Sequence, residues 1–193
     1  MKFSSLFTGF VAGLATVTSV VASPVAIEKR AAQDVLDGIQ NLSDKVVALN
    51  ATAATYRGGL LGIAKAIKIQ IQSGQVQSAI DDAKEAVVDS EEEVFNFEDS
   101  QAISVAMVEL RPRIVSTLQT LISKEPEFAK GVLGFGIIPL NGIVKAGLVK
   151  QKEASGEFAD VLLPKLDPAF SGIAPLLINA INAAFDEAIA VFS

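Results

Sequence analysis

The 193-residue sequence contains no cysteine, no histidine and no tryptophan, and it has a single tyrosine. The absence of cysteine excludes a disulfide scaffold, a thiolate metal site and a cysteine nucleophile. The absence of histidine excludes a Ser-His-Asp triad and imidazole metal ligands. A carboxylate-only enzyme stays open, but no acidic residue lies within an apolar pattern of the kind that surrounds catalytic carboxylates. The composition therefore favours binding or a structural role over catalysis, with no cofactor.

Basic residues are fewer than acidic residues. Sixteen Lys and Arg residues stand against 22 Asp and Glu residues, a formal net charge of −6. No basic stripe is present, so binding to nucleic acid is not expected. Acidic residues crowd the stretch 81–99, but the spacing of a calcium-binding loop is missing, and we interpret this stretch as a solvated surface with no metal. Half of all residues are hydrophobic, which at this length predicts one domain with a substantial core.

The N-terminus has the pattern of a secretory leader. A basic start at Lys2 is followed by an apolar run and by small residues ending at Ala22. We predict a signal peptide over 1–22 rather than a membrane anchor, because serine, threonine and glycine interrupt the run. The dibasic pair Lys29-Arg30 then predicts a propeptide over 23–30. The mature domain, 31–193, is expected to be secreted to the extracellular region or the cell wall, with no transmembrane segment.

Apolar residues recur at alternating steps of four and three positions, the spacing of amphipathic helices that pack in a bundle. The first such series predicts a helix over about 32–55. Later series predict helices over about 140–163 and 173–192. No alternating strand pattern competes with them. The sequence therefore predicts an all-α fold, an antiparallel bundle of about five helices.

Two of these helices contain residues that disturb a helix. Ser73-Gly74 predicts an interruption of the second helix, which leaves pieces over about 60–72 and 75–89. Pro112 lies inside the third helix, whose apolar positions continue on both sides. We therefore expect a kink at Pro112 rather than the end of the helix.

A glycine-rich apolar stretch follows the third helix. Its large side chains are Leu133, Phe135, Ile137 and Ile138, separated by glycines. Such a stretch is too rich in glycine for a stable helix and too apolar for an ordinary surface loop. Two interpretations stay open: a loop packed under the end of the bundle, or a flap that covers a pocket or adsorbs to a surface.

Two N-glycosylation sequons, at Asn41 and Asn50, lie in the first predicted helix. Both are acceptable acceptors in a secreted chain. Glycans there would make one side of the bundle hydrophilic, so an apolar binding surface would lie elsewhere.

The apolar interior is the remaining candidate for function. Small residues in the helix seams either let the helices approach closely or leave room for a ligand. An acyl chain gains about 0.8 kcal/mol per buried methylene, so ten methylenes give roughly 8 kcal/mol before the cost of association. The interior is thus either ordinary core or a site for a fatty acid or related lipid. In the second case the contact residues would be Leu42, Val46, Ile67, Met107, Leu110, Ile114, Phe158, Leu162, Leu177, Ile181 and Phe185.

Three segments carry a resemblance to a known family. They are Tyr56-Arg57-Gly58-Gly59, Leu110-Arg111-Pro112-Arg113-Ile114 and Phe185-Asp186-Glu187-Ala188-Ile189. With the leader and the dibasic pair, they resemble the hydrophobic surface-binding protein A family of filamentous fungi, also described as cell wall galactomannoproteins. The resemblance covers 31–193.

The resemblance implies an all-helical, secreted or wall-associated protein without catalytic activity. Members adsorb to hydrophobic surfaces, and some are implied to recruit hydrolases such as polyesterases there. Relatives with this domain hold fatty acids inside the bundle. The alternative is a structural cell wall mannoprotein without a ligand.

Overall fold

The computed structural model describes residues 24–59, 62–129 and 140–193, so the predicted flap at 131–139 lies outside the described residues. Helices account for nearly all of these ranges, and no strand occurs within them. The all-α prediction is therefore confirmed. The helices are α1 (Pro24–Ala54), α2 (Ile63–Val88), α3 (Phe97–Ser123), the short α4 (Glu125–Ala129), α5 (Leu140–Leu162) and α6 (Ala174–Val191), with 3-10 turns at Leu163–Lys165 and Pro168–Phe170.

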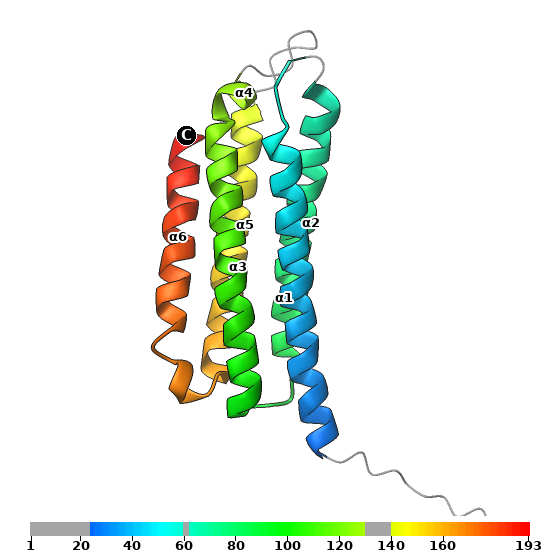
Figure 1. The fold of residues 1–193 in the computed structure, drawn as a ribbon, viewed down its shortest axis with the longest axis vertical. Coiled ribbons are helices and arrows are strands. Elements are labelled where there is room, and N and C mark those ends of the chain that lie inside the picture. Colours follow the sequence, from blue (N-terminus) through cyan, green and yellow to red (C-terminus); the bar gives the residue numbers. More distant parts are fainter. Residues whose placement is uncertain (1–23, 60–61, 130–139) are drawn as a thin grey trace, which may run out of the picture.

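The five long helices stand side by side and alternate in direction along the chain (Figure 1). Helix α1 packs on α2 and α3, α2 packs on α5, and α6 packs on both α3 and α5. These contacts close a ring of five helices around one interior. In Figure 1 the end that carries α4 is the upper end, and α1 begins at the lower end.

The buried face of α1 follows the predicted spacing. Val35, Ile39, Leu42, Val46 and Leu49 are each no more than 4% exposed. The helix begins earlier than predicted, however, at Pro24 rather than near residue 32. Proline suits the first position of a helix, and the residues after it are mostly good helix formers. The dibasic pair therefore lies within α1.

The predicted interruption of the second helix is wrong, because α2 is continuous through Ser73-Gly74. A glycine inside a helix costs only about 1 kcal/mol relative to alanine. A contact from α5 stabilises the turn: the Gln151 side-chain amide donates hydrogen bonds to the Ser73 carbonyl at 3.0 Å and to its hydroxyl at 2.9 Å. Tertiary packing here outweighs the local preference.

Helix α3 continues through Pro112, as predicted, and the proline side chain faces outward. Asn96 caps the start of the helix, and its side-chain oxygen accepts a hydrogen bond from the Asp99 backbone N–H at 2.9 Å. Such a cap satisfies one of the free N–H groups of the first turn.

Polar contacts tie the lower end together. The Lys165 ammonium group donates hydrogen bonds of 2.8–2.9 Å to the Val87 carbonyl and to both oxygens of Ser90 at the end of α2. The Ser100 hydroxyl of α3 accepts from the Asp167 backbone N–H at 2.9 Å. The connection before α6 is therefore anchored to α2 and α3.

An aromatic cluster closes the upper end. Tyr56 stacks on Phe128 with ring centroids 4.5 Å apart, and Phe128 meets Phe192 edge-on at 5.8 Å. All three rings are at most 3% exposed. Burial, followed by the nearby Glu127 carboxylate, raises the pKa of Tyr56. The cluster joins the ends of α1, α4 and α6.

The glycine pair behind this cluster has a positive φ at both positions, 64° at Gly58 and 67° at Gly59. A Cβ atom at Gly58 would lie 2.7 Å from the Glu127 carbonyl oxygen, whereas a Cβ at Gly59 meets nothing within 4 Å. We expect Gly59→Ala to cost about 1–2 kcal/mol, the penalty of the left-handed conformation. Gly58→Ala adds a clash with backbone and should cost about 1 kcal/mol more. Urea denaturation measures both, and equal losses would contradict the packing described here.

Candidate ligand-binding interior

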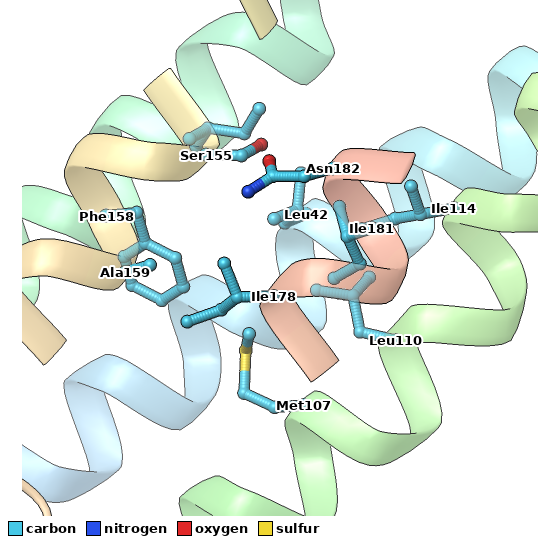
Figure 2. A pocket seen from close by; sticks show the side chains of 11 residues that line it. Leu42, Met107, Leu110, Ile114, Ser155, Phe158, Ala159, Ile178, Ile181 and Asn182 are labelled. Carbon is cyan, nitrogen blue, oxygen red and sulfur yellow. The ribbon is translucent and has the colours of Figure 1, made fainter. Parts of the chain in front are cut away.

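Within the described part of the chain, three small apolar cavities lie inside the ring of helices. The upper and central cavities have volumes of about 30 Å³ each, and the lower one of about 20 Å³. The central cavity is lined by residues from all five long helices (Figure 2). Leu42 reaches it from α1, Ile80 from α2, Leu110 from α3, Phe158 from α5 and Ile181 from α6.

The three cavities form one row along the bundle. The upper and central cavities share Leu42, Ile80, Ile114 and Ser155. The central and lower cavities share Met107, Ala159 and Ile178. On α3 the row extends from Ser104 to Leu121, which is about 26 Å at 1.5 Å per residue. Because neighbouring cavities share lining residues, movement of those side chains would join the cavities into a channel.

Ten of the eleven predicted contact residues line this row. Leu42, Val46, Met107, Leu110, Ile114, Phe158, Leu162, Leu177, Ile181 and Phe185 each contact at least one cavity. The structure thus brings them together, and their role in binding stays a prediction.

The placement of Ile67 in the interior is wrong. Its side chain is 56% exposed, and Ile69 of the same helix is buried instead. The apolar residues of α2 are spread around the helix between Ile63 and Ile71, so their spacing alone did not identify the buried face.

Sequence reasoning missed several lining residues. Ile80 was part of the predicted helix pattern but was not singled out, and Ala159, Ile178, Ser155 and Asn182 were not named as contacts. Ser155, Ala159 and Asn182 are small or polar, and such residues do not mark a buried helix face by hydropathy. The only available signal was their position within one turn of Phe158 or Ile181.

None of the residues that line the row is charged. Among its polar residues, the Thr117 hydroxyl donates to the Arg113 carbonyl at 2.8 Å, and the Gln151 amide is bonded to Ser73. Ser155 and Asn182 also line the central cavity, and both residues are only partly buried. The interior therefore suits an aliphatic chain.

A larger groove of about 220 Å³ lies on the outside, between α1 and α3. Asp37, Glu109 and Arg113 line it, and the Arg113 guanidinium donates a hydrogen bond to the Ser43 hydroxyl. Charged side chains make this groove unsuitable for an aliphatic ligand, despite its greater volume.

The described residues contain no group of three His, Cys, Asp or Glu side chains placed to hold a metal ion. None of the helices among these residues is long and apolar enough to cross a membrane.

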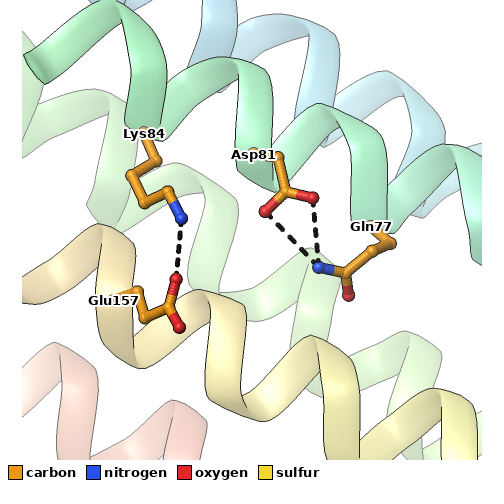
Figure 3. Close-up of polar contacts among 4 residues, drawn as sticks. All are labelled: Gln77, Asp81, Lys84 and Glu157. Carbon is orange, nitrogen blue, oxygen red and sulfur yellow. Dashed lines mark hydrogen bonds and ion pairs between the residues drawn. The ribbon is translucent and has the colours of Figure 1, made fainter.

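On the outer side, the ion pair between Lys84 and Glu157, at 2.7 Å, links α2 to α5 and lies next to Gln77 and Asp81 (Figure 3). The hydrogen bond from Lys84 to Glu157 raises the pKa of Lys84.

The two sequons differ in their surroundings. Asn41 is exposed, whereas Asn50 is half-buried between α1 and α3 and donates a hydrogen bond to the Ser116 hydroxyl at 3.3 Å. In protein secreted by a fungal host we expect a glycan on Asn41 and little on Asn50, because a glycan there would separate α1 from α3. Peptide mass spectrometry after glycosidase release measures both occupancies. Full occupancy of Asn50 in folded protein would refute this expectation.

The fold and the interior define an all-helical up-and-down bundle around an uncharged core. The family model described as hydrophobic surface binding protein A matches residues 32–164, so the chain belongs to that family. It is also 25% identical over 189 residues to cell wall mannoprotein 1 of Aspergillus flavus. That alignment covers 98% of this chain and 62% of the relative, so the chain spans less than two thirds of the relative's length.

Solved structures share the fold. AfMP4p in complex with palmitic acid superimposes with a TM-score of 0.74 at 23% identity, over 84% of this chain and 99% of that one. Ligand binding domain 2 of the Penicillium marneffei MP1 protein, complexed with multiple arachidonic acids, gives 0.70 at 20% identity, over 90% and 98% of the two chains. These likenesses confirm the helical architecture.

Proposed function

We propose that the protein is a secreted, non-catalytic binding protein that holds a lipid with a long aliphatic chain, of the fatty acid type, inside the ring of helices. The row of three uncharged cavities carries this proposal. It gains support from AfMP4p and the MP1 domain, which have the same fold and were solved with palmitic and arachidonic acids.

The cavities are much smaller than the roughly 300–1,000 Å³ of typical ligand pockets, so binding requires the bundle to expand. Helix α6 is the helix of the ring best suited to move when the bundle expands. It contributes residues to all three cavities, among them Phe185, Ile181 and Leu177. Its ion pair from Asp186 to Lys152 is exposed and worth less than about 1 kcal/mol. The burial of a lipid chain would offset the lost contacts of α6.

The experiment is native mass spectrometry of the protein spanning 31–193, mixed with palmitate or arachidonate. We expect a complex with one or more ligands per protein and a higher melting temperature, because a ligand that binds only the folded state stabilises it. The polar groove makes no contact with the cavity row apart from Leu110, so a groove variant such as Glu109→Gln should bind equally well. Absence of both the complex and the thermal shift would refute the proposal.

A second function, adsorption to hydrophobic surfaces, is favoured by exposed apolar side chains on the outside. Ile67 and Ile71 of α2 are 56% and 57% exposed, and Ile143 of α5 is 39% exposed. In this proposal the adsorbed protein recruits a hydrolase such as a polyesterase. The double variant Ile67→Ser/Ile71→Ser should lower adsorption to polystyrene and leave palmitate binding intact. Unchanged adsorption would favour the alternative of a structural wall mannoprotein.

Export and processing complete the proposal. A signal peptide over 1–22 and cleavage after Lys29-Arg30 would release the domain that begins at Ala31. Helix α1 would then start one residue before the buried Ala32. N-terminal sequencing of protein secreted by a fungal host tests the second cleavage, and a variant with Lys29-Arg30 replaced by alanines would show the first.

A further inference from the structure

An apolar surface lies at the lower end of the bundle, where the chain enters α6 beside the start of α3 (Figure 1). The backbone N–H groups of Phe170, Ile173 and Leu176 each donate to the carbonyl three positions earlier, at 2.9–3.1 Å. Side chains three positions apart eclipse in this geometry, so these residues form one column. The Phe97 ring of α3 adjoins the column, with its centroid 5.3 Å from that of Phe170. These four residues are called the lip below.

The lip is exposed and uncharged. Phe97 is 56% exposed, Ile173 48% and Leu176 69%. The sequence has no charged residue over 168–185, although 20% of all residues are charged. A cluster of exposed apolar side chains at one end of a molecule is typical of an interaction surface.

Acidic residues surround the lip. The stretches 89–99 and 163–167 are joined by a hydrogen bond from the Phe95 N–H to the Lys165 carbonyl at 2.7 Å. Together they contain seven acidic residues and one lysine. That lysine is Lys165, whose ammonium group is occupied by the Val87 carbonyl and by Ser90. The charge around the lip therefore favours an uncharged partner surface over an anionic one.

One residue of the lip also lines the cavity row. Ile173 borders the lower cavity, and it is the most exposed of the described residues that line the three cavities, since the others are buried or half-buried. Among the described residues, the hydrogen bonds of 168–173 stay within 167–177. No hydrogen bond of this turn to another helix therefore has to break when Ile173 moves. The outer surface and the row of cavities meet at this residue.

We propose that the lip docks on an uncharged lipid surface, and that lipid passes between this surface and the cavity row by way of Ile173. The inference rests on the proposed function and names where the ligand enters and leaves. The lip inserts its apolar side chains among the acyl chains, while the acidic stretches around it stay in water. An anionic surface would repel these stretches, most strongly at low salt.

The kinetics of lipid transfer test this route. Protein secreted by a fungal host is loaded with an anthroyloxy-labelled stearate and mixed with phosphatidylcholine vesicles that contain a quencher of the label. We expect the transfer rate to rise in proportion to the vesicle concentration, because each transfer requires the lip to meet a vesicle. A rate independent of vesicle concentration would mean that the lipid is released into water, which would overturn the proposal.

Leu176→Glu and a matched control locate the docking surface. Leu176 is not among the residues that line the three cavities, so the variant should keep the wild-type affinity for palmitate. A carboxylate in the lip should slow transfer to phosphatidylcholine roughly tenfold or more, because a charge enters an acyl layer at high cost. Ile71→Glu makes a similar change on α2, at 57% exposure, and should transfer lipid at the wild-type rate. If the two variants transfer at the same rate, the lip is not the docking surface.

Further outcomes separate this proposal from its alternatives. Vesicles of phosphatidylglycerol should accept the labelled stearate more slowly than phosphatidylcholine at low salt, and faster transfer to them would contradict the uncharged partner. A wild-type dimer in analytical ultracentrifugation that Leu176→Glu separates would mean that a second copy covers the lip, and the proposal would be wrong. In each of these cases lipid binding itself stands. If the wild-type protein takes up no labelled stearate, the proposed function fails and this inference with it.

Discussion

Replacing Ala159 by leucine is expected to weaken palmitate binding by roughly fifty-fold. Ala159 is 6% exposed and lines both the central and the lower cavity. Leucine adds three carbon atoms at the junction, which displaces about three methylenes of a bound chain. At about 0.8 kcal/mol each the loss is about 2.4 kcal/mol, and 1.4 kcal/mol corresponds to a tenfold change in affinity.

The control for this variant is Gly38→Ala. Leucine at Ala159 also overpacks the core, which typically costs about 1–3 kcal/mol of stability. Gly38 lies at the contact of α1 with α2, where a new Cβ would stand 3.0 Å from the Ala83 Cα atom and away from the cavities. Gly38→Ala should therefore lower stability without changing palmitate affinity. Parallel loss of affinity in both variants would mean that stability, not the cavity row, governs binding.

Tyr56→Ala is expected to lower the free energy of unfolding by about 3–5 kcal/mol, the range for truncation of a large buried aromatic ring. Tyr56 is 1% exposed and stacks on Phe128, which in turn contacts Phe192. Its removal leaves a cavity where three helices end. Tyr56→Phe keeps the ring and should stay within about 1 kcal/mol of the wild type. Urea denaturation distinguishes the two, and a loss below about 1 kcal/mol for Tyr56→Ala would show that the cluster does not hold the upper end.

The same residue predicts an alkaline effect. Because the folded-state pKa of Tyr56 is raised, the unfolded chain loses its phenolic proton first as pH increases. The contribution to stability is complete below about pH 10, the ordinary value for tyrosine, and is lost as pH rises through the folded-state pKa. Tyr56 is the only tyrosine and tryptophan is absent, so near-ultraviolet absorbance follows this group alone. Titration at or below the ordinary pKa would mean that the ring is not buried.

The bundle was predictable from sequence because its helices are long and their apolar seams are regular. The spacing of Val35, Ile39, Leu42 and Val46 identified the buried face of α1 correctly. The break predicted at Ser73-Gly74 was wrong because the contact with Gln151 comes from a helix 78 positions away. The sequence around Ser73 does not indicate that a residue of another helix contacts it.

The site was predictable only in part. Periodicity selected residues that face inward, and these line the cavities because the cavities lie inside the ring. It could not show that Ser155 and Asn182, on different helices, line the same cavity, since that depends on how α5 packs on α6. Ile67 shows the opposite error, because an apolar residue on a helix with apolar residues on several sides need not face the core.

The central claim is that an aliphatic ligand lies inside the ring of helices and not on its outer surface. Isotope-filtered nuclear Overhauser measurements between palmitate and the methyl groups of the protein test it most directly. We predict contacts from the alkyl chain to the interior methyl groups of Leu110, Ile114 and Ile181, which line the central cavity. Contacts confined to the exposed methyl groups of Ile67 and Ile71 would contradict the claim.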